Sequence, residues 1–219
     1  LIVNSEAVLC SCAVPCLTKC FQKVALKGCF FHLAQNMRKH LVRDGTAHEY
    51  NTDSEFTMSA KMVVALAFVS VSDLDEYITA LESYLLEPLL RLLQWFEDTY
   101  VGRLARRGHE RQPTLFPTAM WNLFQQAQIA EDRTNNYLEA AYRRLRAQLG
   151  ICHHTIWKFI DGLRKVQQGR DAFYEQLLSG HSPPLKLKKY RNADQRIAQI
   201  VGEYGKRNPI DYLRGIAHN

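Results

Sequence analysis

The sequence has 219 residues, of which 47% are hydrophobic and 23% are charged, and its formal net charge is +6. This composition excludes an intrinsically disordered chain, and the length allows one large domain or two small ones. Residues 1–102 carry 8 Lys and Arg against 12 Asp and Glu (net −4), whereas residues 103–219 carry 20 against 10 (net +10). A basic second half predicts an anionic partner: nucleic acid, a membrane surface or an acidic protein.

The first 45 residues are predicted to hold two short strands and a helix. Leu1 to Val3 is an apolar, β-branched run that fits a buried strand, and residues 24–32 form the second strand candidate. The pattern turns helical over residues 33–42 and ends near Gly45, which supplies a C-terminal stop. The chain opens inside the first strand and without Met, so we expect it to be a fragment of a longer domain.

Helical patterns then follow one another. Residues 61–68 predict a compact apolar helix, and Ser72 with Asp75 three residues later predicts a capping box. The helix behind Ser72 carries one apolar stripe, which Pro88 is expected to kink or to divide into two helices. The stripe consists of Leu74, Ile78, Leu81, Leu85, Leu89, Leu92 and Phe96.

The second half of the chain is predicted to be helical as well. A polar, Arg-rich connection over residues 102–117 leads into it, and Ser182-Pro183-Pro184 interrupts it. The expected helices cover residues 118–128, 135–149, 155–178 and 193–204. No stretch reaches the roughly 18 apolar residues of a membrane span, and the N-terminus lacks the basic segment of a secretory signal. We therefore expect no membrane partner.

The cysteines are crowded near the N-terminus, since five of the six precede residue 30 and only Cys152 lies elsewhere. Secreted disulfide frameworks distribute their cysteines along the chain, so this crowding favours an intracellular, reducing compartment. The first four fit no standard zinc or iron–sulfur spacing. They are metal ligands or small buried thiols. They are Cys10, Cys12, Cys16 and Cys20.

Cys29 and His32 form a C-x-x-H pair where the second predicted strand gives way to a helix. A structural zinc site needs four ligands, so this pair would require a second half from Cys152 and either His153 or His154. The simpler alternative is a half-buried thiol beside a histidine at a helix start. Zinc is therefore one of two open interpretations.

A predicted helix begins near Asn135 and places Glu139 about one turn inside. This carboxylate is a solvated surface charge or a ligand for a hard cation. Arginines gather around it in the sequence, and they form either a phosphate-binding cluster or a solvated surface. They are Arg103, Arg106, Arg107, Arg111, Arg143, Arg144 and Arg146. No Gly-rich nucleotide loop follows a strand, and no small-molecule substrate is expected.

Seven blocks of sequence stand in a defined order from residue 27 to the end. They cover residues 27–36, 95–103, 115–117, 121–122, 133–136 with Glu139, 156–161 and 211–219. Each block is short, but the ordered set resembles the C-terminal part of a Mutator-like element (MULE) transposase domain. It is similar in particular to proteins that join a FLYWCH zinc finger to such a domain.

The resemblance implies an RNase H-like fold with a helical insertion and a site of two Asp and one Glu. Such a site binds two Mg²⁺ or Mn²⁺ ions for attack on a phosphodiester. Glu139 would be the catalytic Glu, and the family's C-x-x-H motif matches Cys29 and His32. The first Asp belongs to a strand that would precede Leu1, and Asn4 stands where the second is expected. With two of three carboxylates absent, we expect no cleavage, and the status of the chain as an enzyme stays open.

The fold class expected is mainly α, with a truncated RNase H-like α/β piece of two strands before a helical insertion and C-terminal helices. The truncated sheet would leave an unpaired edge that favours aggregation. We expect four segments: a partial RNase H-like strand and helix fragment, the helical insertion, the Glu-bearing helix with the helix that follows it, and a C-terminal linker and helix. These segments cover residues 1–45, 46–132, 133–180 and 181–219, respectively.

The leading hypothesis is a MULE-type transposase remnant that binds DNA in the nucleus and no longer cuts it. The alternative is a host-adopted helical module that binds DNA or protein without catalysis. A third hypothesis, a zinc-stabilised interaction domain, depends on Cys29, His32 and Cys152. Oligomerisation stays open in all three.

Overall fold

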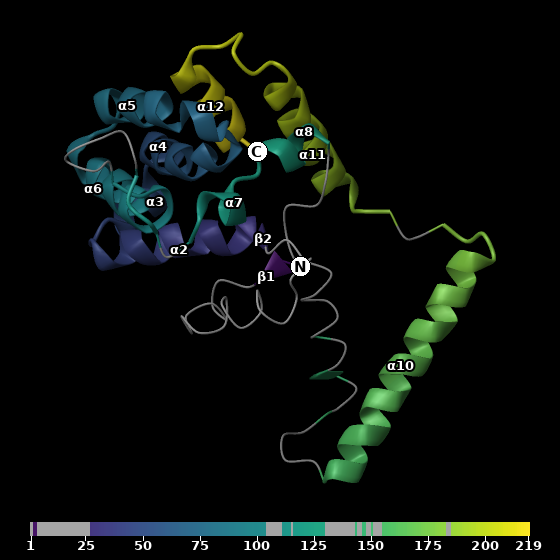
Figure 1. The fold of residues 1–219 in the computed structure, drawn as a ribbon. Helices are drawn as coiled ribbons and strands as arrows, with labels where there is room; N and C mark the ends of the chain where they lie inside the picture. The colour runs from purple at the N-terminus through teal and green to yellow at the C-terminus, as the bar shows by residue number, and fades with distance from the viewer. Residues whose placement is uncertain are drawn as a thin grey trace. The chain divides into compact units, whose positions relative to one another are not determined.

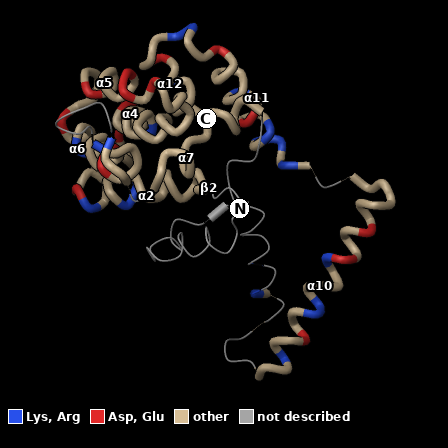
Figure 2. The backbone as a smooth tube through the Cα atoms, in the orientation of Figure 1, with Lys and Arg blue, Asp and Glu red and all other residues tan. Residues whose placement is uncertain are grey.

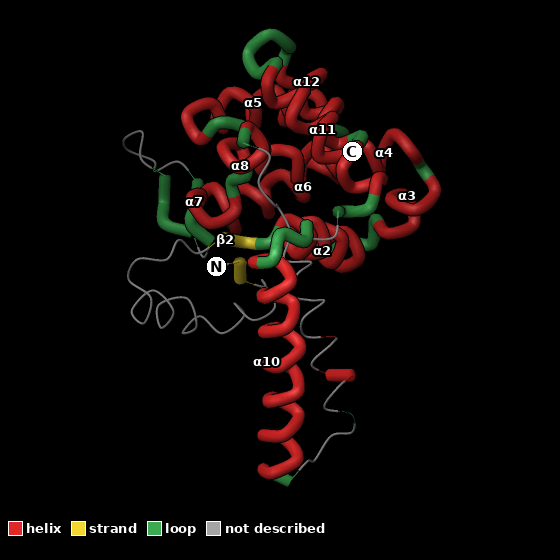
Figure 3. Tube along the Cα trace, turned by 90° about the vertical axis from the view of Figure 1, so that its right-hand side faces the viewer, coloured by secondary structure: helices red, strands yellow, loops and turns green. Residues whose placement is uncertain are grey.

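Helices make up nearly all of the regular structure in the part of the chain that the computed structural model describes (Figures 1 and 3). That part comprises residues 2–3, 27–103, 111–114, 116–129, 143, 146–147, 150, 155–182 and 185–219. The chain divides into two units: unit 1 combines Leu1–Thr134 with Lys189–Asn219, and unit 2 is Asn135–Lys188. The prediction of a mainly helical protein is confirmed, and the RNase H-like piece stays a prediction.

Most described elements belong to unit 1. Its first half holds β1 (Ile2–Val3), β2 (Lys27–Gly28), α2 (Phe30–Arg43), α3 (Ala47–Thr52), α4 (Ser54–Ala65), the short turns η2 (Leu66–Phe68) and η3 (Val71–Asp73), and α5 (Leu74–Tyr84). There follow α6 (Glu87–Phe96), the π-helical turn η4 (Glu97–Val101), α7 (Thr118–Trp121), α8 (Phe124–Gln128), α11 (Lys188–Gly202) and α12 (Pro209–Ala217). In unit 2 the described element is α10 (Ile156–Leu178).

The two predicted strands form a short parallel pair, in which Ile2 lies opposite Lys27 and Val3 opposite Gly28. The second strand is shorter than predicted: the expectation of a strand up to residue 32 is wrong, because α2 already begins at Phe30. Helical packing decides this boundary, since α2 buries Leu33, Met37 and Leu41, and their spacing of four continues the first turn. Gly45 then adopts φ 77° and ends the helix as predicted.

The core is built around α4 and η2. Ala60 and all residues from Met62 to Val69 are buried, and α4 contacts α2, α3, α6 and α12 (Figure 1). The predicted helix over residues 61–68 is longer than expected because Asp53 caps an earlier start: its carboxylate accepts hydrogen bonds from the amides of Glu55 and Phe56. The preceding helix α3 was not predicted.

The carbonyls at the end of η2 are paired with residues from distant parts of unit 1. Leu123 N donates to Ala67 O (2.6 Å), Tyr212 Oη to Phe68 O (2.5 Å) and Asn122 Nδ2 to Val69 O (2.7 Å). Water cannot donate hydrogen bonds to the last carbonyls of a buried helix end. These three groups donate the hydrogen bonds instead. Burial also raises the pKa of Tyr212, which keeps its hydroxyl a donor.

The predicted apolar stripe on either side of Pro88 is confirmed, since all seven of its residues are buried. Of the two expected effects of Pro88, division is observed: α5 ends at Tyr84, and Pro88 lies in the first turn of α6, where its missing N–H costs no helical hydrogen bond. The predicted capping box at Ser72 is wrong. Ser72 lies in η3, and its hydroxyl donates to Asp73.

The carboxylate of Asp73 also accepts a hydrogen bond from Tyr204 Oη at 2.7 Å. The two hydroxyl donors, Ser72 first and then Tyr204, lower the pKa of Asp73 below its ordinary value. Burial together with this contact raises the pKa of Tyr204, which keeps the phenol neutral. The turn before α5 is thereby tied to the chain after α11.

The later helices differ in their boundaries from the predictions. The single helix expected over residues 118–128 is two short ones, α7 and α8, because residues 122–123 turn to cap η2. The helix expected over residues 155–178 is confirmed, with Thr155 as N-cap. The last predicted helix begins earlier, at Lys188, and α12 was missed. Of the helix expected over residues 135–149, Arg143, Arg146 and Ala147 are described and are helical.

The hydrogen bond from Tyr212 to Phe68 gives a testable prediction. Tyr212→Phe keeps the ring but leaves a buried carbonyl unpaired, and we expect it to lower the free energy of unfolding by about 1–3 kcal/mol. The control is Tyr84→Phe, because Tyr84 is exposed and its hydroxyl only accepts a long contact of 3.5 Å from Arg214. Urea denaturation measures both. Equal losses in the two variants would contradict this role of Tyr212.

Candidate functional site

The two residues predicted for the catalytic site, Asn4 and Glu139, lie outside the described residues. Asn4 directly follows β1 in the sequence. Within the described part of the chain, no three Cys, His, Asp or Glu side chains come together in a group that could hold a metal ion. The described residues therefore do not fit a two-metal centre, and the roles of Asn4 and Glu139 stay predictions.

Cys29 and His32 lie where β2 passes into α2, as predicted. Cys29 is the N-cap residue, and its carbonyl accepts hydrogen bonds from the amides of His32 (3.0 Å) and Leu33 (3.1 Å). The pair therefore occupies the first turn of one helix. Both side chains are buried, with 3% of the surface of Cys29 and 4% of that of His32 exposed. The proposed second half of a zinc site, Cys152 with His153 or His154, lies outside the described residues.

The imidazole of His32 has an unusual environment for a polar group. Its Nδ1 is buried and has no hydrogen-bond partner among the described residues, and its ring meets Phe31 edge-on, with ring centroids 5.4 Å apart. An unpaired buried donor or acceptor costs about 1–3 kcal/mol. Packing alone therefore does not account for a histidine at this position.

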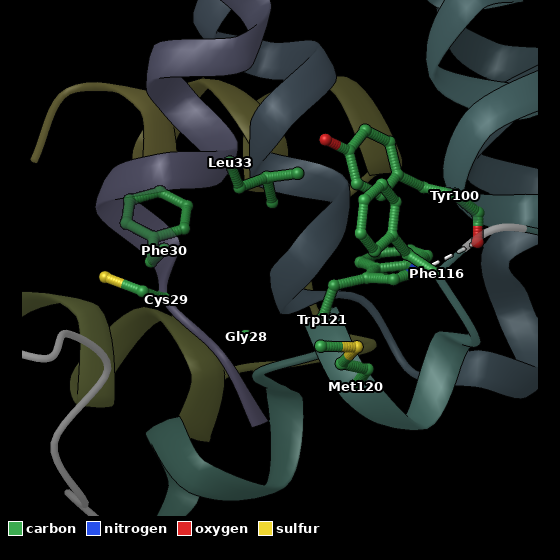
Figure 4. A pocket seen from close by; sticks show the side chains of 8 residues that line it. All are labelled: Gly28, Cys29, Phe30, Leu33, Tyr100, Phe116, Met120 and Trp121. Carbon is green, nitrogen blue, oxygen red and sulfur yellow. Dashed lines mark hydrogen bonds between the residues drawn. The ribbon is translucent and has the colours of Figure 1, made fainter. Parts of the chain in front are cut away.

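A small apolar cavity of about 30 Å³ lies against the β2–α2 junction (Figure 4). Three parts of unit 1 meet there: the junction itself, the turn η4, and the segment leading into α7. Its lining residues are Gly28, Cys29, Phe30, Leu33, Tyr100, Phe116, Met120 and Trp121. Because almost no polar atom faces this space, it suits an apolar group and not a phosphate-bearing ligand.

Hydrogen bonds fix the aromatic wall of this cavity. Trp121 Nε1 donates to the carbonyl of Tyr100 at 2.8 Å, as the dashed line in Figure 4 shows, and Asn36 Nδ2 donates to the hydroxyl of Tyr100 at 3.0 Å. Burial raises the pKa of Tyr100, so the phenol stays neutral. Phe116 stacks on Tyr100 with ring centroids 5.3 Å apart. Sequence reasoning did not identify this cavity, although its aromatic residues lie in the blocks that carry the family resemblance.

The turn after η4 depends on a glycine. Gly102 adopts φ 88°, and a Cβ atom there would lie 2.1 Å from the carbonyl oxygen of Gln112. Arg111 closes the same turn: it binds the carboxylates of Asp75 and Glu97 and the carbonyl of Gly102. Burial alone would lower the pKa of Arg111, but the hydrogen bonds and charges of the two carboxylates outweigh it and raise the pKa.

The arginines predicted to bind DNA are placed only in part. Arg103 forms a two-pronged ion pair with Asp98, which raises the pKa of Arg103, and Arg111 is held as described above. Their guanidinium groups are thus engaged by carboxylates of the acidic half, which does not favour phosphate contact. Arg143 and Arg146 are exposed. The remaining members, Arg106, Arg107 and Arg144, lie outside the described residues.

A second basic cluster, which sequence reasoning missed, lies in the first turn of α11 (Figure 2). Lys188, Lys189 and Arg191 are exposed there, and the turn contains no acidic residue. The aromatic ring of Tyr190, half-exposed, stands between them. The signal was present as a run of cations over residues 186–191.

Comparisons of the chain with protein-family models, with curated proteins and with solved structures find no match. None of the helices in the described residues combines the length and the apolar character needed to cross a bilayer.

The unpaired imidazole gives a prediction that separates packing from metal binding. His32→Phe removes a buried polar atom without a partner, so we expect the melting temperature of EDTA-treated protein to stay the same or rise. If His32 is a zinc ligand, added zinc stabilises the original protein but not the variant. Thermal melts of both proteins with EDTA and with zinc measure this. A fall in the melting temperature of the EDTA-treated variant would contradict the prediction.

Proposed function

We propose that the chain is a MULE-type transposase derivative that binds DNA in the nucleus without cutting it. The observation that carries this proposal is the meeting of the family-like blocks in space. Four blocks separated by up to about 90 residues in the sequence supply every lining residue of the apolar cavity except Met120. Packing of these blocks around one cavity is what we expect if they derive from one structural unit of the family.

The strand pair is a second support for this ancestry. β1 and β2 are parallel, and parallel neighbours need a crossover of a dozen or more residues. Residues 4–26 provide that length. A parallel pair followed by a helix, next to a helical region, is the arrangement that a truncated RNase H-like piece with its insertion would have.

The proposed loss of cleavage follows from Asn4. A two-metal site needs several carboxylates to hold the ions, and Asn4 offers a neutral amide where the family has Asp. Glu139 would then belong to a site without its second Asp. The chain alone would therefore bind DNA without breaking it.

We predict that the chain does not nick supercoiled plasmid DNA with either Mg²⁺ or Mn²⁺. Agarose electrophoresis of the plasmid over several hours measures this. Metal-dependent nicking that is lost in Glu139→Gln would refute the proposed inactivity. Nicking that persists in Glu139→Gln would indicate a contaminating nuclease, and the assay would be repeated with protein freed of it.

DNA contact is proposed at the first turn of α11. The first turn of α11 is the positive end of the helix dipole, and it contains Lys188, Lys189 and Arg191. Their charges are repelled by the dipole, and a bound anion would offset this repulsion. Exposed cations in one helical turn suit contact with the phosphates of duplex DNA. Arg106, Arg107, Arg143 and Arg144 stay separate candidates for phosphate contact.

We predict that replacing Lys188, Lys189 and Arg191 together by Gln weakens binding to duplex DNA at least about tenfold at 100 mM salt. If all three contact phosphates, the slope of log affinity against log salt falls by about 2.7. Fluorescence anisotropy at several salt concentrations measures both quantities.

The matched control removes the same number of charges at three exposed positions elsewhere in the chain: Arg43→Gln, Lys61→Gln and Arg91→Gln. We expect this variant to keep most of the affinity. A further variant with Gln at Arg106, Arg107, Arg143 and Arg144 tests the arginine cluster. Equal affinity in all variants would contradict DNA contact through these residues.

The alternative function, a helical module that binds protein without catalysis, has one observation in its favour. Helix α10 exposes large apolar side chains along its length, among them Ile156, Trp157 and Tyr174. This function is compatible with DNA binding, since the two surfaces belong to different helices.

A further inference from the structure

Helix α10 carries a heptad pattern of apolar residues. Starting from Ile156 as position a, the a positions are Ile156, Leu163, Arg170 and Leu177, and the d positions are Phe159, Val166 and Phe173. Six of these seven positions are apolar, over a helix about 34 Å long. A repeat of 3.5 residues is the pattern of helices that pack lengthwise against another helix.

The face defined by these positions is open to a large extent. Ile156 exposes 62% of its surface, Phe173 46%, and Phe159 and Leu163 40% each. The opposite face is polar over most of its length, with Asp161, Lys165, Gln168 and Glu175, and it carries exposed Trp157 and Leu178 at its two ends. Val166 and Leu177 are half-buried, and Arg170 interrupts the stripe. An exposed apolar seam of this length on a helix indicates a partner.

We propose that the partner is α10 of a second copy of this chain, packed antiparallel. The single charged core position favours this orientation. In a parallel pair, Arg170 would meet Arg170 of the other copy, and like charges in the core repel. In the antiparallel register that centres between Arg164 and Lys165, Arg170 instead meets Phe159, where the guanidinium can lie over the ring.

The remaining core layers of this register are apolar. Ile156 meets Phe173, and Leu163 meets Val166, each twice by symmetry. The symmetric contact closes on itself, so it gives a dimer and not a filament.

The charges outside the core agree with the same orientation. The first half of α10 carries Lys158, Arg164 and Lys165 against Asp161, whereas the second half has Asp171 and Glu175 outside the core. Antiparallel packing places the positive half of one copy beside the negative half of the other. Parallel packing would place like beside like.

We predict that the purified full chain is a dimer and that Leu163→Glu weakens dimerisation at least about tenfold. The matched control is Gln168→Glu, which adds the same charge on the polar face and leaves the dimer unchanged. Sedimentation equilibrium between about 1 and 100 μM measures the dissociation constants. A monomer throughout this range, or a dimer insensitive to Leu163→Glu, overturns the proposal.

Two further measurements keep the test decisive if Leu163→Glu disturbs the fold. Arg170→Leu removes the polar core position and is expected to tighten the dimer about tenfold or more while relaxing its orientation. A photo-crosslinker, p-benzoylphenylalanine, in place of Tyr174 is expected to react near Thr155 of the other copy. Mixed ¹⁴N and ¹⁵N protein distinguishes crosslinks between copies from those within one chain by mass spectrometry.

Crosslinks between copies near residue 174 itself would mean parallel packing and refute the antiparallel arrangement. Crosslinks only within one chain would mean that another segment covers α10. Crosslinks to an added protein alone would assign the face to a different partner. Each of these results overturns the proposal, independently of whether the chain binds DNA.

Discussion

The pairing of the carbonyls at the end of η2 is the constraint on which unit 1 depends. Residues 62–69 are buried without interruption, so their last carbonyls must find partners within the protein or lose about 1–3 kcal/mol each. Asn122, Leu123 and Tyr212 supply those partners. Total stabilities of domains are only about 5–15 kcal/mol. The segments that carry these residues are therefore fixed against the core helix, and the aromatic wall beside Trp121 is fixed with them.

Hydrophobic periodicity predicted the helices whose ends are determined by nearby residues. It missed the helix ends that are determined by contacts with distant parts of the chain. The stripe from Leu74 to Phe96 and its division by Pro88 could be predicted, because apolar spacing and proline act within a few residues. The break between α7 and α8 could not be predicted, because residues 122–123 turn to pair with the carbonyls of Ala67 and Val69 at the end of η2. The missed helix α12 did carry a local signal, Asn208 followed by Pro209, which is an N-cap with proline at the first position.

For the candidate site, the sequence predicted which element carries a residue better than it predicted the surroundings of its side chain. The C-x-x-H pair was placed correctly at a helix start, but nothing in its spacing indicates that His32 lies buried with an unpaired nitrogen. The net charge of the second half predicted an excess of positive charge, but it did not predict which basic side chains stay exposed. Arg103 and Arg111 begin the basic half, yet they neutralise Asp75, Glu97 and Asp98 of the acidic half. The excess positive charge that stays exposed includes the start of α11, which no motif identified.

Unit 1 is formed by two separate parts of the sequence, which affects how it folds during synthesis. During synthesis, α4 is made about 150 residues before Tyr212, the residue that caps the end of its buried segment. Until then, the ribosome holds a nascent chain whose central apolar run lacks one of its partners and one of its covering helices. Contacts of such long sequence separation form slowly, and exposed apolar surface favours aggregation in the interval. The topology of unit 1 therefore delays completion of its core until both parts of its sequence have been made.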